Sequence, residues 1–409
     1  MTEKTKPAVE GGKPVRAQPL AFAKPFIGEE EIAEVVQTIK SGWLTTGPKT
    51  KEFEKKFNEY IGDGSTVQKP LQSIAVSSCT AALHVSLAAL GVSHGDEVLV
   101  PSMTFVSTAN VAVHLGAKPV FVDVESDTGN LDASKIESAI TKKTKAIIPV
   151  HFAGHPCAMD EIEKIAKKHG LAIVEDAAHA SGTQYKGKKI GSLDTFSSCF
   201  SFYATKNLAT GEGGMICTRN EEKGALMRRL SLHGMSKDAW NRYSDKGSWY
   251  YEVTEAGFKD NMTDIQASIG LHQLAKLDKM NKMREKIALQ YSKEFSKIKE
   301  LALPVVKSYA TRHSWHLYPM HLKKGALSID RSKFIEALKA EGILASVHFI
   351  PVHMHPFYQK TFGCKKGGYP AAEAFYEGEV SLPLYPGMSE QDVADTVEAV
   401  KKIVEWYSK

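Results

Sequence analysis

Residues 97–123 read EVLVPSMTFVSTANVAVHLGAKPVFVD, and this stretch decides the fold class. Its two ends, residues 97–100 and 119–123, are short apolar runs rich in β-branched side chains and predict strands. Residues 106–115 between them have the spacing of a helix. Two strands joined by a helix of about ten residues form a βαβ unit, whose strands run parallel. The stretch therefore predicts an α/β protein.

The same alternation extends in both directions along the chain. Repeated βαβ units build a mainly parallel sheet that helices cover on both faces. Further helices are expected at residues 81–90, 133–140 and 159–169, and further strands at residues 146–150 and 172–175.

The chain of 409 residues is longer than one hydrophobic core usually supports, so two domains are expected. A large domain is placed at residues 25–289, ending within a long helix predicted from 264 to 295, and a smaller C-terminal α/β domain at residues 290–409. The composition of residues 1–24 predicts a flexible tail. The shorter elements of the small domain are expected at residues 316–321, 331–341, 346–349 and 389–406.

Composition excludes several classes of protein. The chain is 43% hydrophobic and 24% charged, and it lacks the run of roughly 18 apolar residues that a membrane span needs. The tail has no apolar segment typical of a secretion signal. Five scattered cysteines without a CxxC pair favour a reduced, cytoplasmic protein. A net charge of +5 from interleaved charges does not imply nucleic acid as a partner.

One lysine stands in an unusual setting. Residues 199–217 read CFSFYATKNLATGEGGMIC, so small and apolar residues surround Lys206 and a glycine-rich turn follows it. A partly desolvated amine loses its charge more readily, which a Schiff-base lysine requires. Taken alone, however, a lysine at the end of a strand is usually solvated. The glycines have two interpretations, since ordinary turns use glycine for the same reasons as ligand sites do.

Two further motifs suggest a ligand site. Residues 173–180 read IVEDAAHA and place Asp176 at the carboxyl end of a strand, where α/β sheets bind ligands. Residues 75–85 read AVSSCTAALHV, a strand followed by hydroxyl residues and a helix, which is the pattern of a phosphate site with Ser78 and Thr80 as donors. Both motifs have a purely structural alternative, because Asp, Ser and Thr also cap helices.

Four motifs together resemble the DegT/DnrJ/EryC1/StrS family of nucleotide-sugar aminotransferases. They are SGWLTTGP (41–48), EDAAHA (175–180), SFYATKNLATGEGG (201–214) and SLPLYPGM (381–388), and the similarity runs from about residue 25 to the C-terminus. The resemblance implies the fold of aspartate aminotransferase, fold type I of the transferases that depend on pyridoxal 5'-phosphate (PLP). It also implies a homodimer that binds PLP between its subunits.

The resemblance assigns roles to individual residues. Lys206 would form the Schiff base with PLP, Asp176 would pair with the pyridine nitrogen, and His179 would lie against the ring and its 3-hydroxyl. Phe105, which without the family would be assigned to the core, would stack on the opposite face. The phosphate ligands would be Ser78, Thr80, the amide of Ala81, and Ser201.

Other site residues are less clearly specified. In the family an Asn of the partner subunit contacts the phosphate; Lys259 stands at that position here and Asn261 at a neighbouring Arg position, and either suits a phosphate. Trp240 and Arg242 suit a nucleotide sugar, although their loop is equally well explained as structurally idle.

A run of histidines lies near the middle of the second domain. His348 and His353 match a family segment near the active site, which favours substrate-side or packing roles. A third histidine nearby raises the possibility of zinc, but neighbouring cysteine or carboxylate ligands are missing from the pattern, so no metal is expected.

The implied reaction is a ping-pong transamination. L-Glutamate would donate its amino group and leave pyridoxamine 5'-phosphate as the intermediate. A nucleotide-linked keto sugar would then accept the amine, and a 4-keto hexose is the first candidate. The products would serve surface polysaccharide or secondary-metabolite synthesis. The alternatives are a sugar dehydratase of the same family, which carries His in place of Lys206, and a non-catalytic regulator. A nicotinamide oxidoreductase is disfavoured because GxGxxG is absent.

Overall fold

A seven-stranded sheet forms the centre of the computed structural model, which describes residues 5–62, 70–236 and 250–409. Its strand order is β1-β9-β8-β5-β4-β2-β3. Every strand runs parallel to the others except β9, which is antiparallel to both of its neighbours. This confirms the predicted α/β class. The strands are β1 (Gln72–Val76), β2 (Glu97–Pro101), β3 (Lys118–Val122), β4 (Thr144–Ile147), β5 (Ala172–Asp176), β8 (Ser197–Ser201) and β9 (Gly214–Thr218).

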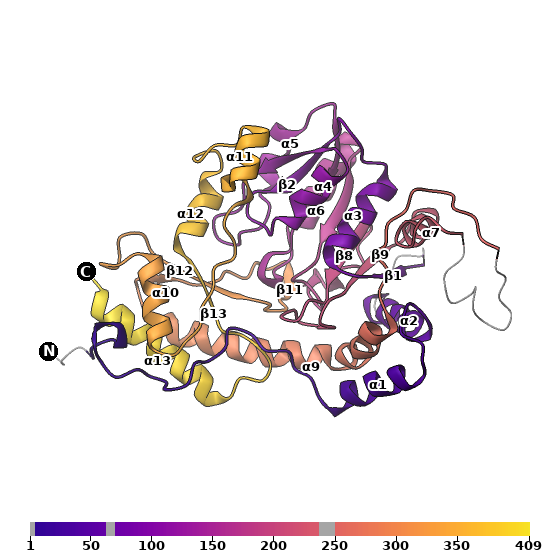
Figure 1. Ribbon diagram of the computed structural model, residues 1–409. Helices are drawn as coiled ribbons and strands as arrows, with labels where there is room; N and C mark the ends of the chain where they lie inside the picture. The colour runs from indigo at the N-terminus through magenta and orange to yellow at the C-terminus, as the bar shows by residue number, and fades with distance from the viewer. Residues whose placement is uncertain (1–4, 63–69, 237–249) are drawn as a thin grey trace.

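Helices cover both faces of this sheet (Figure 1). Leu99 and Ile173 lie in an apolar cluster on one face, whereas their strand neighbours Val98 and Val174 lie in a second cluster on the other. Strands buried on both sides are mainly apolar, as residues 98–100 of β2 and 172–174 of β5 are. The helices of the large domain are α1 (Glu29–Lys40), α2 (Pro48–Gly62), α3 (Cys79–Leu90), α4 (Ser107–His114), α5 (Ala133–Ala139), α6 (Met159–His169), α7 (Glu221–Leu230) and α9 (Asp264–Phe295).

The C-terminal part of the chain packs around a smaller antiparallel sheet with the order β10-β12-β13. The last turns of α9 enter its core, where Tyr291 and Phe295 contact Tyr318. This separate cluster supports the domain boundary near residue 290, which we retain as a proposal. The elements here are β10 (Leu301–Ala302), β12 (Tyr318–Leu322), α10 (Arg331–Ala340), α11 (Pro356–Phe362), α12 (Pro370–Gly378), β13 (Glu379–Leu382) and α13 (Glu390–Tyr407).

Short elements complete the structure. A second small sheet joins β11 (Ala310–Arg312) to β6 (Gln184–Tyr185) and β7 (Lys188–Lys189), and single helical turns lie at Ala8–Glu10, Phe152–Gly154 and Val352–Met354. The element expected at residues 346–349 is not a strand, because only Ser346 pairs there, with Ser381.

The N-terminal segment differs from the flexible tail that its composition predicted. Over the described residues 5–24 it crosses the small domain before reaching α1 (Figure 1). Arg16 forms ion pairs with Asp392 and Asp395, and Leu20 is 3% exposed and pairs with Ile343. Composition misses this packing because a few anchoring contacts hold a segment that is otherwise polar.

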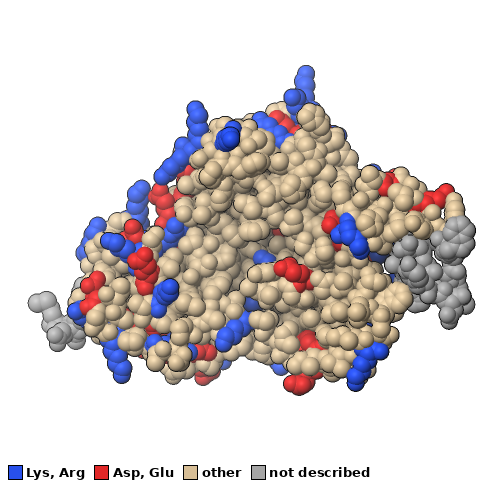
Figure 2. All heavy atoms as spheres, viewed as in Figure 1, with Lys and Arg blue, Asp and Glu red and all other residues tan. Residues whose placement is uncertain are grey.

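The surface in view carries charges of both signs. Figure 2 shows Lys and Arg side chains interspersed with Asp and Glu side chains over this face. Across the described ranges, no helix combines the length and the apolar character needed to cross a membrane.

Candidate active site

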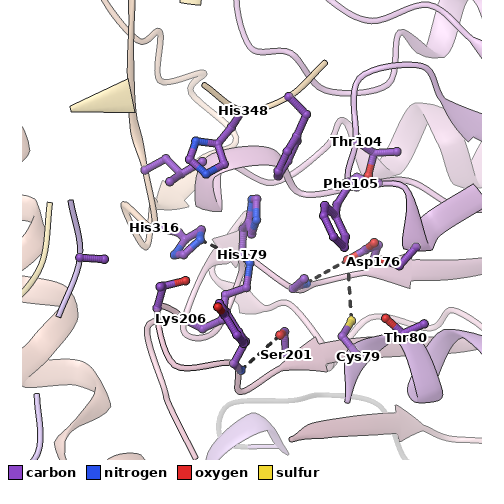
Figure 3. A pocket seen from close by; sticks show the side chains of 18 of the residues that line it. Cys79, Thr80, Thr104, Phe105, Asp176, His179, Ser201, Lys206, His316 and His348 are labelled. Carbon is purple, nitrogen blue, oxygen red and sulfur yellow. Dashed lines mark hydrogen bonds between the residues drawn. The ribbon is translucent and has the colours of Figure 1, made fainter. Parts of the chain in front are cut away.

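A cavity of about 480 Å³ lies at the carboxyl ends of the central parallel strands. Asp176 ends β5 and Ser201 ends β8, while Ser78 and Thr80 lie where β1 leads into α3. The cavity wall therefore combines segments that are about one hundred residues apart in the chain. Figure 3 shows Thr80, Phe105, Asp176, His179, Ser201, Lys206 and His348 around one space, as the resemblance implied.

Asp176 is a buried carboxylate held in a fixed orientation. The hydroxyl of Thr108 donates to Oδ2 at 2.8 Å, and the amide of Ala178 donates to Oδ1 at 3.1 Å. Burial raises the pKa of Asp176 above its ordinary value, and these two hydrogen bonds oppose the shift. A cation placed in the cavity would favour the ionised form of this side chain. The helix-cap alternative does not apply, because no helix begins after Asp176.

Lys206 lies on the turn that follows β8 and lines the cavity. Burial lowers the pKa of its ammonium group to about 8, and the charge of Asp176 opposes this shift. The solvated-lysine alternative is thus wrong for Lys206. The lowered pKa makes the neutral, nucleophilic form of the amine more accessible near neutral pH than it is for an ordinary lysine.

The glycines after Lys206 are required by the backbone conformation and the close packing of this turn. Gly211 has a φ of 82°, the left-handed region that favours glycine. A Cβ on Gly214 would lie 2.5 Å from the carbonyl carbon of Ser78, so this turn packs directly against the start of α3. The close approach that glycine permits here is between two backbone segments, and it holds the lysine turn beside the helix N-terminus.

The N-terminus of α3 faces the cavity through Ser78 and Thr80. The Ser78 hydroxyl accepts a hydrogen bond of 3.0 Å from the amide of Ala81 and so caps the helix. Ser78 fits both interpretations, since it caps α3 and also lines the cavity. Helix N-termini attract anions through their free amides and dipole.

The two rings that the resemblance assigns to the faces of the cofactor both line the cavity. Phe105 is 56% exposed, so it is not part of the core. His179 is buried, and its Nδ1 accepts a hydrogen bond of 3.2 Å from the amide of Ala153. Burial holds the pKa of His179 well below its usual value, so the ring is neutral and carries its proton on Nε2. His179 is therefore a hydrogen-bond donor through Nε2.

The small domain and the N-terminal segment close one side of the cavity. His348 lines it and stacks on Phe22, with ring centroids 5.5 Å apart. The ring of His348 is fixed by a hydrogen bond of 2.9 Å between Nδ1 and the hydroxyl of Ser381. Burial lowers the pKa of His348 to about 3. The segment predicted as a tail thus contributes Phe22 to the site.

His353 does not reach the cavity, contrary to the substrate-side position that it shares with His348 in the resemblance. It is completely buried, and hydrogen bonds occupy both ring nitrogens: Nδ1 pairs with the hydroxyl of Ser102 at 2.6 Å and Nε2 with Glu373 at 3.0 Å. His353 packs the small domain onto β2, which agrees with the packing alternative.

The remaining predicted residues lie elsewhere. Trp240 and Arg242 fall outside the described residues. Lys259 donates to Asn261, which in turn donates to the hydroxyl of Thr46 at 2.7 Å. Neither residue lines the cavity of its own chain. Their contact with a partner's phosphate remains a prediction.

Besides Phe22, sequence reasoning missed Thr108 and His316. Thr108, in the first turn of α4, orients Asp176, and its signal was the hydroxyl-rich stretch 102–108 that leads from β2 into this helix. His316 lies with its Nε2 atom 3.5 Å from Nζ of Lys206, although more than one hundred residues separate the two. A histidine in the run RHSWHLYP offered no spacing that linked it to the lysine.

Comparison with known proteins places these features in a family. Residues 25–401 match the model of the DegT/DnrJ/EryC1/StrS aminotransferase family. The spore coat polysaccharide biosynthesis protein SpsC of Bacillus subtilis is 52% identical over 386 residues, which cover 94% of this chain and 97% of SpsC.

Solved structures of sugar aminotransferases have the same fold. The putative sugar aminotransferase Spr1654 of Streptococcus pneumoniae, solved in a PLP-form, is 37% identical with a TM-score of 0.86, covering 95% of this chain and 99% of that one. PseC of Helicobacter pylori, an aminotransferase involved in the biosynthesis of pseudoaminic acid, is 30% identical with a TM-score of 0.86, covering 95% and 100%. These likenesses confirm fold type I. The chain belongs to the DegT/DnrJ/EryC1/StrS aminotransferase family.

Proposed function

We propose that the protein is a PLP-dependent aminotransferase that moves the amino group of L-glutamate to a nucleotide-linked keto sugar, with a 4-keto hexose as the first candidate. The observation that carries the proposal is the meeting of Lys206, Asp176 and the N-terminus of α3 at one cavity. SpsC takes part in polysaccharide biosynthesis, which supports a role in making amino sugars for surface polysaccharide or secondary metabolites.

The residues present suit PLP. Asp176 is a buried carboxylate whose charge a cationic ring nitrogen would stabilise, and the α3 N-terminus with Ser78, Thr80 and nearby Ser201 suits a phosphate group. Phe105 and His179 suit the two faces of a planar ring. Spr1654 was solved in PLP-form and PMP-form, which supports the same cofactor here, with pyridoxamine 5'-phosphate formed during turnover.

PLP, when bound, supplies an electron sink for the carbon that loses a proton. The side chains of the protein would supply the charge, the hydrogen bond and the base. Asp176 would hold the ring nitrogen in its protonated form, and the Nε2 proton of His179 would be available to a ring substituent. The free amine of Lys206 would take up the proton from the donor carbon and pass it to the carbon that accepts it, because its lowered pKa makes the neutral amine accessible near neutral pH.

The same geometry weighs against the alternatives. A sugar dehydratase of this family carries His where this chain has Lys206, so the lysine favours transamination. A non-catalytic regulator has no need of a lysine whose pKa burial lowers to about 8.

The two half-reactions provide the test of function. Purified holoenzyme mixed with L-glutamate alone is expected to release about one equivalent of 2-oxoglutarate per chain and to lose its near-ultraviolet to blue absorbance. A panel of nucleotide-linked 3-keto and 4-keto sugars, assayed by mass spectrometry, would then identify the acceptor. If no 2-oxoglutarate forms with glutamate, the proposed donor is wrong, and if no sugar gains an amine, the proposed acceptor class is wrong.

We also propose that the protein is a homodimer with shared active sites. On α1, Ile32, Val36 and Ile39 recur at helical spacing and are 50%, 42% and 53% exposed. A stripe of aliphatic side chains on one face of a helix is typical of a surface that another chain covers. Lys259 and Asn261, outside their own cavity, suit the phosphate of the partner subunit.

Disrupting this stripe is expected to separate the subunits. The double substitution Ile32→Glu and Ile39→Glu places two charges in the proposed interface, where their desolvation opposes association. Sedimentation velocity should show a dimer for the unchanged protein and for the control Val306→Glu, which alters a side chain 46% exposed on the small domain. The double variant should sediment as a monomer. If the protein without substitutions sedimented as an active monomer, the proposal would be wrong.

We place the protein in the cytoplasm. All five cysteines are free in the structure, and four of them are buried, which fits a reducing compartment where disulfides rarely form.

A further inference from the structure

His316 contacts Lys206 and takes no part in the proton transfer proposed above. Its Nε2 atom lies 3.5 Å from Nζ of Lys206 (Figure 3). The ring is buried and lies against His179, with centroids 4.3 Å apart. A histidine in this place can either donate to the amine or accept from it. Which of the two it does depends on the position of its single proton.

A chain of hydrogen bonds on the other side of the ring settles that position. The carbonyl of Ser181 can only accept, so the side-chain nitrogen of Asn281, 2.9 Å away, must donate to it. The oxygen of Asn281 then accepts from the side-chain nitrogen of Asn207 at 2.7 Å. The second hydrogen of that nitrogen goes to the carbonyl of Ser314, also at 2.7 Å. Asn207 is therefore left with its oxygen facing His316.

The Asn207 oxygen lies 3.1 Å from Nδ1 of His316 and can only accept, so Nδ1 carries the proton. Burial keeps the pKa of His316 well below its usual value, so the ring has no second proton. Nε2 therefore has a free lone pair, which faces Nζ of Lys206. We propose that His316 is a positioning residue whose Nε2 accepts a hydrogen bond from the Lys206 amine and holds that amine at the cavity whenever it is free.

The backbone around His316 is anchored as well. Arg284 of α9 is buried, and its Nη1 donates to the carbonyls of Trp315 at 3.4 Å, His316 at 3.3 Å and Leu384 at 2.7 Å. Trp315 has a φ of 49°, which residues other than glycine rarely adopt. The ring of His316 is thus fixed from both its backbone and its Asn207 side.

This inference rests on the proposed function, in which Lys206 must leave the cofactor and return to it in each cycle. A neutral acceptor beside the amine stabilises its charged form more than its neutral form, because hydrogen bonds to charged groups are the stronger. It therefore opposes part of the loss of charge that burial causes. The titratable groups that face Lys206 together with His316 are Asp176, Cys79, His179 and His348.

The test measures the apparent pKa of Lys206 in cofactor-free protein, from the rate at which acetic anhydride labels its peptide between pH 6 and 10, followed by mass spectrometry. The variant His316→Asn keeps an amide that can donate to Asn207 but ends short of Lys206. The variant His316→Gln keeps an oxygen at the position of Nε2. We expect the pKa of Lys206 to fall by about one pH unit in His316→Asn and to change by less than roughly 0.3 in His316→Gln.

Two controls make the result specific. His313→Asn alters a buried neighbour that stacks on Trp315 instead of facing Lys206, and it should leave the labelling profile unchanged. Asn207→Leu leaves His316 in place but removes the acceptor that fixes its proton on Nδ1, so the pKa of Lys206 should fall as in His316→Asn. This second variant answers the question if His316→Asn does not fold.

An unchanged pKa of Lys206 in both His316→Asn and Asn207→Leu would overturn the proposal. An equal fall in His316→Gln and His316→Asn would overturn it too, because that pattern reflects lost packing and not a lost acceptor. Since the measurement uses neither cofactor nor substrate, its failure is distinct from failure of the proposed transamination.

Discussion

Replacing Lys206 by alanine is expected to lower the rate of transamination at least about 10³-fold. The substitution removes both the amine that would hold PLP and the group that would carry the proton. The variant should still fold, because burial disfavours the ammonium group, as the lowered pKa of about 8 shows, and its removal relieves that cost. Steady-state release of 2-oxoglutarate, with a nucleotide keto sugar as acceptor, measures the loss.

A matched control for this variant is Lys167→Ala, which removes a lysine side chain 77% exposed on α6 and should leave turnover unchanged. Ethylamine added to Lys206→Ala should restore part of the rate, because the space of the missing side chain lies at the cavity wall and admits a small amine. Turnover above about a tenth of the normal rate without added amine would show that Lys206 is not the catalytic base.

Replacing Asp176 by asparagine is expected to slow the reaction about 10²-fold or more, with little effect on folding. An asparagine side chain has nearly the same shape, and its oxygen can still accept from the amide of Ala178. Its NH₂ group would face Thr108, whose hydroxyl can rotate to accept. What is lost is the negative charge that keeps a ring nitrogen protonated. The measurement is kcat with glutamate, alongside the thermal unfolding midpoint.

Asp160→Asn provides the control for Asp176→Asn, since Asp160 lies on α6 with a side chain 58% exposed. It should change neither kcat nor the unfolding midpoint appreciably. If Asp176→Asn kept more than half of the normal kcat, the assigned pairing with the cofactor would be wrong. A large fall in the unfolding midpoint would instead identify Asp176 as a structural residue.

Much of the site follows from local sequence because strand ends and helix starts are local features. Asp176 ends an apolar strand and Ser78 precedes a helix, and in a parallel sheet such positions meet at one edge. The resemblance added Phe105 and His179, and the structure places both at the cavity. These residues could be found because each sits at a fixed offset from a recognisable element.

Other parts of the site could not be found in this way. His316 reaches Lys206 only after the small domain has packed against the large one, and Phe22 reaches His348 only because the N-terminal segment is anchored at Arg16 and Leu20. His353, for which the motif left a substrate-side or a packing role open, pairs with Ser102 and Glu373 and packs. His348 thus lines the cavity whereas His353, five residues later, is buried away from it, and the motif alone does not distinguish the two positions.

The sequence by itself determined the α/β class, the family and the residues that follow each strand. Hydrophobic periodicity and short motifs involve only residues that are close together in the chain. Only the tertiary structure decided which nitrogen of His316 carries the proton, how Thr108 orients Asp176, and that the N-terminal segment closes the cavity. These features depend on distances between segments far apart in the chain. Packing sets such distances, and a pattern of neighbouring residues does not contain them.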